Sequence, residues 1–178
     1  MNSKNNNDIE KNSLLPGGGM GRGLALLPGS FDPFTKGHAD LVERGLQLFD
    51  HIVIAVGYNE NKEGWIPVRE RVDALKALYA NEPRVTVESY SCLTADFAKQ
   101  CGATAILRGI RSVKDYEYEM QLADVNKQLS GIETFLLFSN PQYSSVSSSI
   151  VRELAHFGKD IQPFLPEGLH YSNTKLER

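Results

Sequence analysis

Residues 24–38 read LALLPGSFDPFTKGH, and this stretch decides the fold. It runs from an apolar segment through a turn rich in glycine and proline to Gly37 and His38, where a helix is expected to begin. A strand that leads into a helix in this way presents free backbone amides and the positive end of the helix dipole to an anion. The stretch therefore predicts a phosphate-binding turn, which the rest of the chain supports.

Downstream of Gly23, short apolar runs alternate with segments whose apolar residues have helical spacing. The runs predicted as strands cover residues 24–27, 51–57, 84–89, 103–107 and 134–138. This alternation is typical of parallel strands joined by crossover helices. We predict an α/β fold: a Rossmann-like, doubly wound sheet of five parallel strands with helices on both faces.

Two of these strands contain continuously apolar runs, IVIAV at 52–56 and FLLF at 135–138. Such runs are typical of strands that are buried on both faces of a sheet. We therefore expect both strands to lie inside the sheet.

The later helices have recognisable ends. Thr94 is predicted to cap the third helix, which ends at Gly102. The fourth helix is predicted over about 112–129, stopping at Gly131, and the fifth begins in the serine run near Ser147.

The chain of 178 residues suits one domain, predicted at 23–178, after a disordered extension at 1–22 that is rich in Asn, Ser and Gly. A short helix is expected within 163–178, packed on the rim of the domain or against a neighbouring subunit. The first residues lack the features of a secretory signal, so a cytoplasmic setting is expected.

The composition is 41% hydrophobic and 23% charged, with a net charge of -3. This balance argues against a nucleic-acid surface but leaves room for a local cluster of Lys and Arg that binds a small phosphorylated ligand. No apolar run approaches the ~20 residues that cross a bilayer, so no membrane partner is expected. Cys92 and Cys101 stand nine positions apart with no CxxC motif, which indicates neither a disulfide framework nor a zinc site.

Ligands of a doubly wound sheet bind beyond the carboxyl ends of its strands. Hydroxyl side chains and cations stand at these positions, whereas the carboxylates in the same loops are Asp32 and Glu60. This set favours phosphate recognition over acid/base chemistry on carbon. The candidates are Ser30, Phe31, Lys62, Cys92–Thr94, Arg108, Gly109, Arg111 and Tyr143–Ser149.

Each candidate also has a purely structural interpretation. His38 would donate hydrogen bonds to a phosphoryl oxygen, or else only cap or pack in a strand-to-helix turn. Arg108 and Arg111 flank a glycine and suit bidentate phosphate contacts, but surface arginines without a ligand are common. Ser147, Ser148 and Ser149 would hold nucleotide phosphates, or serve only as an N-cap with polar neighbours.

The motifs together resemble a known family. PGSFDPFTKGH resembles the (T/H)xGH signature of the nucleotidyltransferase superfamily, and VSSSIVR resembles its second signature, ISSTxxR, with Ser149 in place of Thr. With LRGIRSVKDYEYEMQLADVN between them, residues of roughly 24–167 look like the bacterial phosphopantetheine adenylyltransferases. One departure is the loop at 140–145, which is one residue longer than in some relatives.

The resemblance implies a role for each site residue. His38 is expected to stabilise the transition state. The residues expected to bind the substrate are Ser30, Lys62, Thr94 and Arg108. The residues expected to bind ATP are Ser30, Phe31, His38, Gly109, Ile110, Arg111, Glu119, Tyr143, Ser144, Ser145, Val146, Ser147, Ser148 and Ser149.

The resemblance also implies the reaction, in which AMP passes from ATP to 4'-phosphopantetheine to give dephospho-coenzyme A and pyrophosphate on the way to coenzyme A. No side-chain base is needed, because the attacking phosphate is already ionised. Mg2+ is expected as cofactor, bound through substrate phosphates rather than by metal ligands of the protein. A homohexamer is expected on the same ground.

Two rival functions stay open at this point. A related cytidylyl or nicotinamide-mononucleotide transferase would share PGSFDP and GH, although the LRGIR and DYEYEMQLADVN stretches favour the pantetheine enzyme. The second rival is a nucleotide-binding regulatory domain without catalysis. The intact His38, Arg108 and serine run argue against it.

Overall fold

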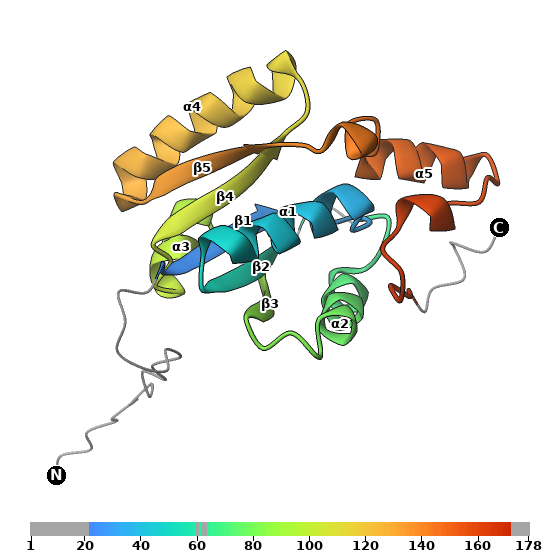
Figure 1. Cartoon of the computed structure of the whole chain (residues 1–178), viewed down its shortest axis with the longest axis horizontal. Coiled ribbons are helices and arrows are strands. Elements are labelled where there is room, and N and C mark those ends of the chain that lie inside the picture. Colours follow the sequence, from blue (N-terminus) through green and yellow to red (C-terminus); the bar gives the residue numbers. More distant parts are fainter. Residues whose placement is uncertain (1–21, 60, 62–63, 172–178) are drawn as a thin grey trace, which may run out of the picture.

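The computed structural model describes residues 22–59, 61 and 64–171. Five strands form one parallel sheet in the order β3-β2-β1-β4-β5 (Figure 1). The strands are β1 (Leu24–Gly29), β2 (His51–Gly57), β3 (Val85–Tyr90), β4 (Ala105–Ile110) and β5 (Glu133–Phe138). The chain winds outward from β1 to β3 and then returns to the other side of β1, so the switch point lies between β1 and β4. The predicted fold class is confirmed.

Five α-helices and two 3-10 turns complete the described chain: α1 (Lys36–Leu48), α2 (Val68–Leu78), α3 (Thr94–Gln100), α4 (Val113–Ser130), η1 (Pro141–Tyr143), α5 (Ser148–His156) and η2 (Gln162–Phe164). Ser147 caps α5 as predicted, and Gly131 ends α4 with a φ of 77°, a conformation that favours glycine. Thr94 differs from the prediction, because it is the first residue of α3 and Leu93 stands at the N-cap position.

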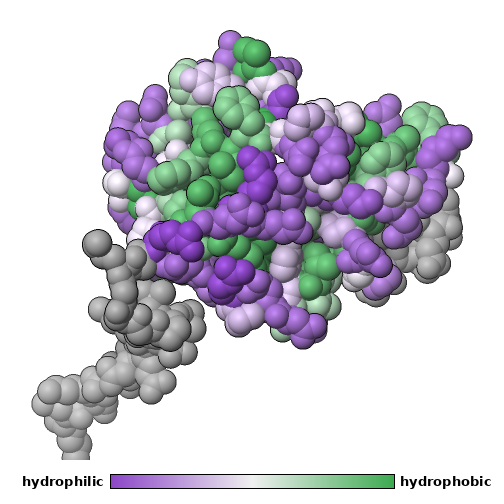
Figure 2. All heavy atoms as spheres, in the orientation of Figure 1, coloured by the Kyte–Doolittle hydropathy of each residue, from purple (hydrophilic) through white to green (hydrophobic). Residues whose placement is uncertain are grey.

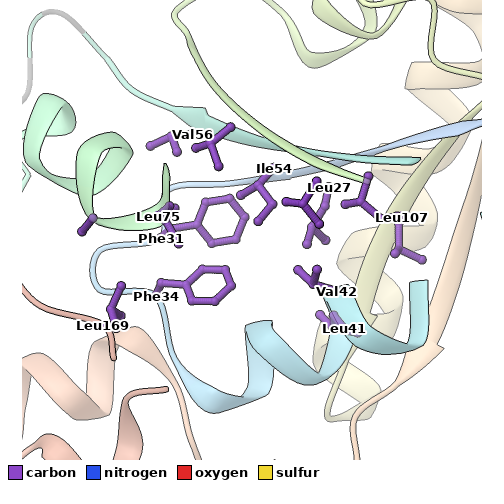
Figure 3. Packing of buried hydrophobic residues seen from close by; sticks show 14 of the residues in the cluster. Leu27, Phe31, Phe34, Leu41, Val42, Ile54, Val56, Leu75, Leu107 and Leu169 are labelled. Atoms are coloured by element: carbon purple, nitrogen blue, oxygen red, sulfur yellow. The ribbon is translucent and has the colours of Figure 1, made fainter. Parts of the chain in front are cut away.

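The core has two layers, one on each face of the sheet. The larger cluster joins α1, α2 and α5 to one face, and Figure 3 shows its centre around Leu27, Ile54, Leu75 and Leu107. The smaller cluster packs α3 against the other face around Leu26 and Ile106. Helices cover both faces of the sheet, so the side at which the carboxyl ends of the strands meet is left open.

The bounds of β4 differ from the sequence prediction. The expected strand ended at Leu107, where the apolar run stops, whereas β4 continues to Ile110 and pairs Arg108 with Leu136 and Gly109 with Leu137. Backbone pairing does not depend on an apolar side chain, so the strand runs on past the arginine. Arg108 therefore projects from the sheet itself rather than from a loop.

The prediction that both apolar strands are buried holds for β2 and is wrong for β5. β2 lies inside the sheet between β3 and β1, and all of its residues except the two at its ends are buried. β5 is an edge strand, and Phe135 and Phe138 are 48% and 76% exposed. Figure 2 shows hydrophobic residues gathered on the side of the molecule where α4 and β5 lie in Figure 1.

Some predictions fall on residues outside the described set. The extension predicted at 1–22 lies there except for Arg22, and so does Lys62. Within the described part of 163–178, the chain follows η2 and buries Leu165 and Leu169. Among the helices of the described ranges, none is long and apolar enough to cross a membrane.

Candidate active site

His38 is the third residue of α1 and is fixed by the residue that caps this helix. Thr35, at the N-cap, donates its backbone N–H to Nδ1 of His38 at 3.0 Å. This bond is one half of a capping box, in which the N3 side chain reaches back to the N-cap amide. The rings of Phe31 and Phe34 lie 5.1 and 5.3 Å from the imidazole. His38 does cap and pack, and that is how its ring is oriented.

The surroundings of His38 also set its charge. Burial, with the positive charges of Arg111 and Arg108 nearby, lowers the pKa of His38 from 6.5 to about 4. The ring is therefore neutral at neutral pH. Since Nδ1 accepts a backbone hydrogen bond, the proton of the neutral ring lies on Nε2, which is left as a donor.

Most of the predicted ATP-binding residues surround one cavity of about 260 Å³. It lies between the start of α1, the end of β4, the start of α4 and the start of α5. Its lining includes His38, Arg108, Gly109, Arg111, Glu119, Tyr143, Val146, Ser147, Ser148 and Ser149. Residues far apart in sequence thus converge, because parallel strands end on the same edge of the sheet.

Both arginines of this cavity are paired with carboxylates of α4. Arg108 donates from Nε and NH2 to the two carboxylate oxygens of Glu119, with Nε 2.7 Å from Oε2. Arg111 donates from Nε to Oδ2 of Asp115 at 3.1 Å. Glu119, a predicted ATP contact, is only 7% exposed and holds Arg108 in place.

The three serines at 147–149 make different contacts, some with the backbone around α5 and some at the cavity. Ser147 caps α5 by accepting from the N–H of Ile150 at 3.2 Å. Ser148 donates from Oγ to the carbonyl oxygen of Pro33 at 2.7 Å. Ser149 lies exposed at the cavity, and its Oγ accepts from NH2 of Arg152 at 3.1 Å. The helix start therefore presents its amides to the cavity, as an anion site requires.

Two further cavities continue the groove along the strand ends. One of about 610 Å³ is lined by Ser30, Tyr90, Cys92, Thr94 and Trp65, among others. A smaller one of about 180 Å³ shares Ser30 and Thr94 with it and shares Arg108 and Glu119 with the 260 Å³ cavity. The predicted substrate residues Ser30, Thr94 and Arg108 therefore line one continuous groove beside the ATP candidates.

The β1–α1 loop, residues 30–35, is held by partners from later parts of the chain. Asp32 accepts the backbone N–H groups of Trp65 at 2.7 Å and Ile66 at 2.8 Å. Arg71 donates to the carbonyl oxygen of Ser30, and Arg152 donates to that of Asp32. These bonds satisfy the backbone and fix the loop that carries the capping residue of His38.

Comparisons with known proteins identify the family of this chain. Residues 26–154 match the family model described as cytidylyltransferase-like. The chain is 54% identical over 145 residues to the phosphopantetheine adenylyltransferase of Phocaeicola vulgatus, an alignment that covers 82% of this chain and 96% of that protein. The chain belongs to the phosphopantetheine adenylyltransferase family. The phosphopantetheine adenylyltransferases of Bacteroides fragilis and Porphyromonas gingivalis are 53% and 51% identical to this chain. The alignments cover 82% and 84% of this chain and 97% of each relative.

Family membership confirms the resemblance drawn from the motifs. The matched region, 26–154, spans β1 to α5 and therefore contains the whole 260 Å³ cavity. The chain is a nucleotidyltransferase of this family. This excludes the alternative function of a nucleotide-binding regulatory domain without catalysis.

Among the described residues, four members of the predicted set of site residues do not line the groove. Phe31 is 3% exposed with its ring in the core, and Ile110 is buried too, so only their backbone is available to a nucleotide. Ser144 and Ser145 are exposed, and Ser144 donates its hydroxyl to Pro141 at 2.8 Å. The roles of these residues toward the family's nucleotide stay predictions.

Three residues that the sequence did not single out lie at the site. Thr35 is 1% exposed and orients His38, and its signal was the helix start three residues before the histidine. Arg152 follows Ser148 and Ser149 by four and three residues, the spacing of one helix face. Asn126 lines the 180 Å³ cavity with Glu119, seven positions earlier on α4.

The side chains around the cavity suit a metal ion only if the ion is bound through the phosphates of a nucleotide. Among the described residues, no group of three or more His, Cys, Asp or Glu side chains is placed to hold a metal ion. The carboxylates of the ATP cavity, Asp115 and Glu119, are both paired with arginines. A divalent cation would therefore meet phosphate oxygens rather than a cluster of protein carboxylates.

Proposed function

We propose that this chain transfers AMP from ATP to 4'-phosphopantetheine. An oxygen of the substrate phosphate forms a bond to the α-phosphorus of ATP, the bond from that phosphorus to the α–β bridging oxygen breaks, and pyrophosphate leaves. The products are dephospho-coenzyme A and pyrophosphate. The observation that carries the proposal is the contiguous groove, in which a cavity with two arginines and two helix starts adjoins a larger cavity for the second substrate.

His38 is the residue proposed to act on the reacting phosphate. Its neutral ring has Nδ1 occupied by the Thr35 amide, so Nε2–H is the donor toward charge that grows on the α-phosphate oxygens. A neutral imidazole keeps its Nε2 proton because that N–H is a very weak acid, so the ring donates a hydrogen bond without transferring the proton and has one protonation state across neutral pH. The role is that of a transition-state stabiliser and not of a base.

The other residues are proposed to align the two substrates. Arg108, at the junction of the cavities, would contact the attacking phosphate, with Ser30 and Lys62 as further contacts. Arg111 and the amides and hydroxyls of residues 147–149 would hold the phosphates of ATP. Alignment of two bound reactants supplies a large share of the acceleration in a transfer that needs no proton abstraction.

Mg2+ is proposed as the cofactor, bound through the phosphates of ATP. When bound, it would neutralise phosphate charge and favour the departure of pyrophosphate. The absence of a carboxylate cluster among the described residues supports binding through substrate oxygens. A cytoplasmic setting is proposed with the pathway.

Pyrophosphate release tests the function directly. Purified chain with ATP, 4'-phosphopantetheine and Mg2+ should release pyrophosphate, and CTP or nicotinamide mononucleotide in place of the respective substrate should not support comparable rates. The His38→Ala variant should lose about 10²- to 10³-fold in kcat while its Kd for ATP stays within about threefold. Faster turnover with CTP or with nicotinamide mononucleotide would establish a related transferase instead.

We further propose that the chain assembles as a homohexamer. Exposed apolar side chains on α4 and β5 support self-association, among them Val113, Tyr118, Val125, Phe135 and Phe138. An uncovered edge strand with exposed phenylalanines is a ready contact for another copy. Light scattering should give six chain masses for the wild type and a smaller mass for Phe138→Glu, and a wild-type mass of one chain overturns the proposal.

A further inference from the structure

One hydrogen bond ties the far end of the described chain to the β1–α1 loop. The backbone N–H of Phe34 donates to the hydroxyl oxygen of Tyr171 at 3.0 Å, across 137 positions of sequence. Phe34 immediately precedes Thr35, whose own N–H donates to Nδ1 of His38. Two consecutive amides of the loop thus have fixed acceptors, and the second acceptor is the imidazole proposed to act in catalysis.

Tyr171 is itself held firmly enough to serve as an anchor. It packs against the larger core cluster and follows Leu169, which is 1% exposed, by two residues. Figure 3 shows Leu169 reaching the same part of the core as Phe34. Burial raises the pKa of the Tyr171 phenol, so the hydroxyl stays uncharged at physiological pH.

No other described side chain outside α1 accepts a hydrogen bond from a backbone amide of the loop. Apart from Thr35, which bonds to the first turn of α1, the other described contacts to the loop backbone come from Arg71, Ser148 and Arg152, and all of them donate to carbonyl oxygens. Tyr171 supplies an acceptor for an amide, which these donors do not provide. Without it, the N–H of Phe34 would be buried with no partner, an arrangement that a loop avoids by moving.

We propose that Tyr171 is a positioning residue for His38, because its hydroxyl fixes the loop backbone from which the imidazole receives its Nδ1 hydrogen bond. The proposal rests on the proposed adenylyl transfer for its kinetic consequence only. The structural link itself, from Tyr171 through residues 34 and 35 to the ring, is present without substrate.

Tyr171→Phe removes the hydroxyl and keeps the ring, and Tyr79→Phe is the matched control. Tyr79 is also a half-buried tyrosine against the same residue, with its ring 6.2 Å from that of Phe34, but its hydroxyl makes no hydrogen bond to the loop within the described ranges. Tyr171→Phe should lower kcat about three- to tenfold and leave both KM values within about twofold. Tyr79→Phe should match the wild type.

A second measurement needs no turnover. With ¹⁵N-labelled histidine, the wild-type signal of His38, assigned by its loss in His38→Gln, should show Nδ1 unprotonated and Nε2 protonated at pH 7. Tyr171→Phe should shift this signal toward a mixture of the two tautomers and should speed exchange of the Phe34 amide hydrogen, while Tyr79→Phe does neither.

The two readouts separate the possible failures. A Tyr171→Phe protein with wild-type kcat and an unchanged His38 signal overturns the proposal. A shifted signal in a protein with no adenylyl transfer at all would uphold the positioning of His38 and overturn the proposed function. Rapid exchange of the Phe34 amide in the wild-type protein would refute the hydrogen bond without any variant.

Discussion

The guanidinium of Arg108 and the carboxylate of Glu119 form a bidentate ion pair at the boundary between the cavities of about 260 Å³ and 180 Å³. Arg108 also donates from NH1 to the carbonyl oxygen of Pro28, so strand β4 is tied to β1 and helix α4 through one side chain. Glu119 thus fixes the direction of the guanidinium that is proposed to contact the attacking phosphate.

Replacing Glu119 by Gln keeps the side-chain shape and removes its charge. We expect kcat/KM to fall about tenfold or more and the free energy of unfolding to fall by about 1–3 kcal/mol, because Arg108 loses its charge-assisted bonds. Steady-state kinetics and urea unfolding measure the two effects. Glu117→Gln, at an exposed position of the same helix, should change neither, and equal losses in both variants would contradict the role given to Glu119.

The depressed pKa of His38 predicts how stability depends on pH. The unfolded chain binds a proton at this site below pH 6.5 and the folded chain only near pH 4, so the contribution is fully present above pH 6.5 and is lost as pH falls to 4. The difference amounts to about 3 kcal/mol. Urea unfolding at pH 7 and pH 5 should show a smaller pH dependence in His38→Gln than in the wild type, and identical curves would contradict a ring held neutral in the folded protein.

Two serines of the same run should separate helix capping from ligand binding. Ser147→Ala should lower the free energy of unfolding by about 1 kcal/mol, because α5 loses its N-cap. Ser149→Ala should leave stability nearly unchanged and raise KM for ATP, since its hydroxyl faces the cavity. Thermal unfolding and ATP titration distinguish them, and a stability loss confined to Ser149→Ala would reverse the assignment.

Gly109 lies where a side chain would collide with the core. A Cβ built there would stand 2.5 Å from Cδ1 of Leu41, a buried residue of α1. Gly109→Ala should therefore cost about 1–3 kcal/mol of unfolding free energy. Gly37→Ala is the control, because its Cβ would meet nothing closer than 3.7 Å and alanine favours the helix. A stable Gly109→Ala protein would count against the tight packing of β4 on α1.

Sequence patterns predicted the architecture because they are local. Alternating apolar runs and helical spacing placed all five strands within a few residues, and Gly131 and Ser147 marked helix ends through their own backbone and side-chain chemistry. Where prediction failed, neighbours in space decided the outcome. FLLF in β5 has the composition of a buried strand, but only its position at the sheet edge determines its exposure.

The sequence predicted many of the residues that surround the cavity, but it did not predict the hydrogen bonds and ion pairs between them. Motif order identified His38, Arg108, Arg111 and the serine run, and the fold brings them around one cavity. The pairing of Arg108 with Glu119, eleven positions later, and of Phe34 with Tyr171 depends on how strands and helices are placed. No spacing rule connects such residues.

The hydrogen bonds on the β1–α1 loop also impose an order on how the site is made. A ribosome synthesises residues 30–38 early, whereas their partners Arg71, Ser148, Arg152 and Tyr171 emerge progressively later. The loop therefore has its full set of hydrogen bonds only once Tyr171 has left the ribosome. A nascent chain stalled before that point would lack the bonds to the loop that carries Thr35, the residue that orients His38.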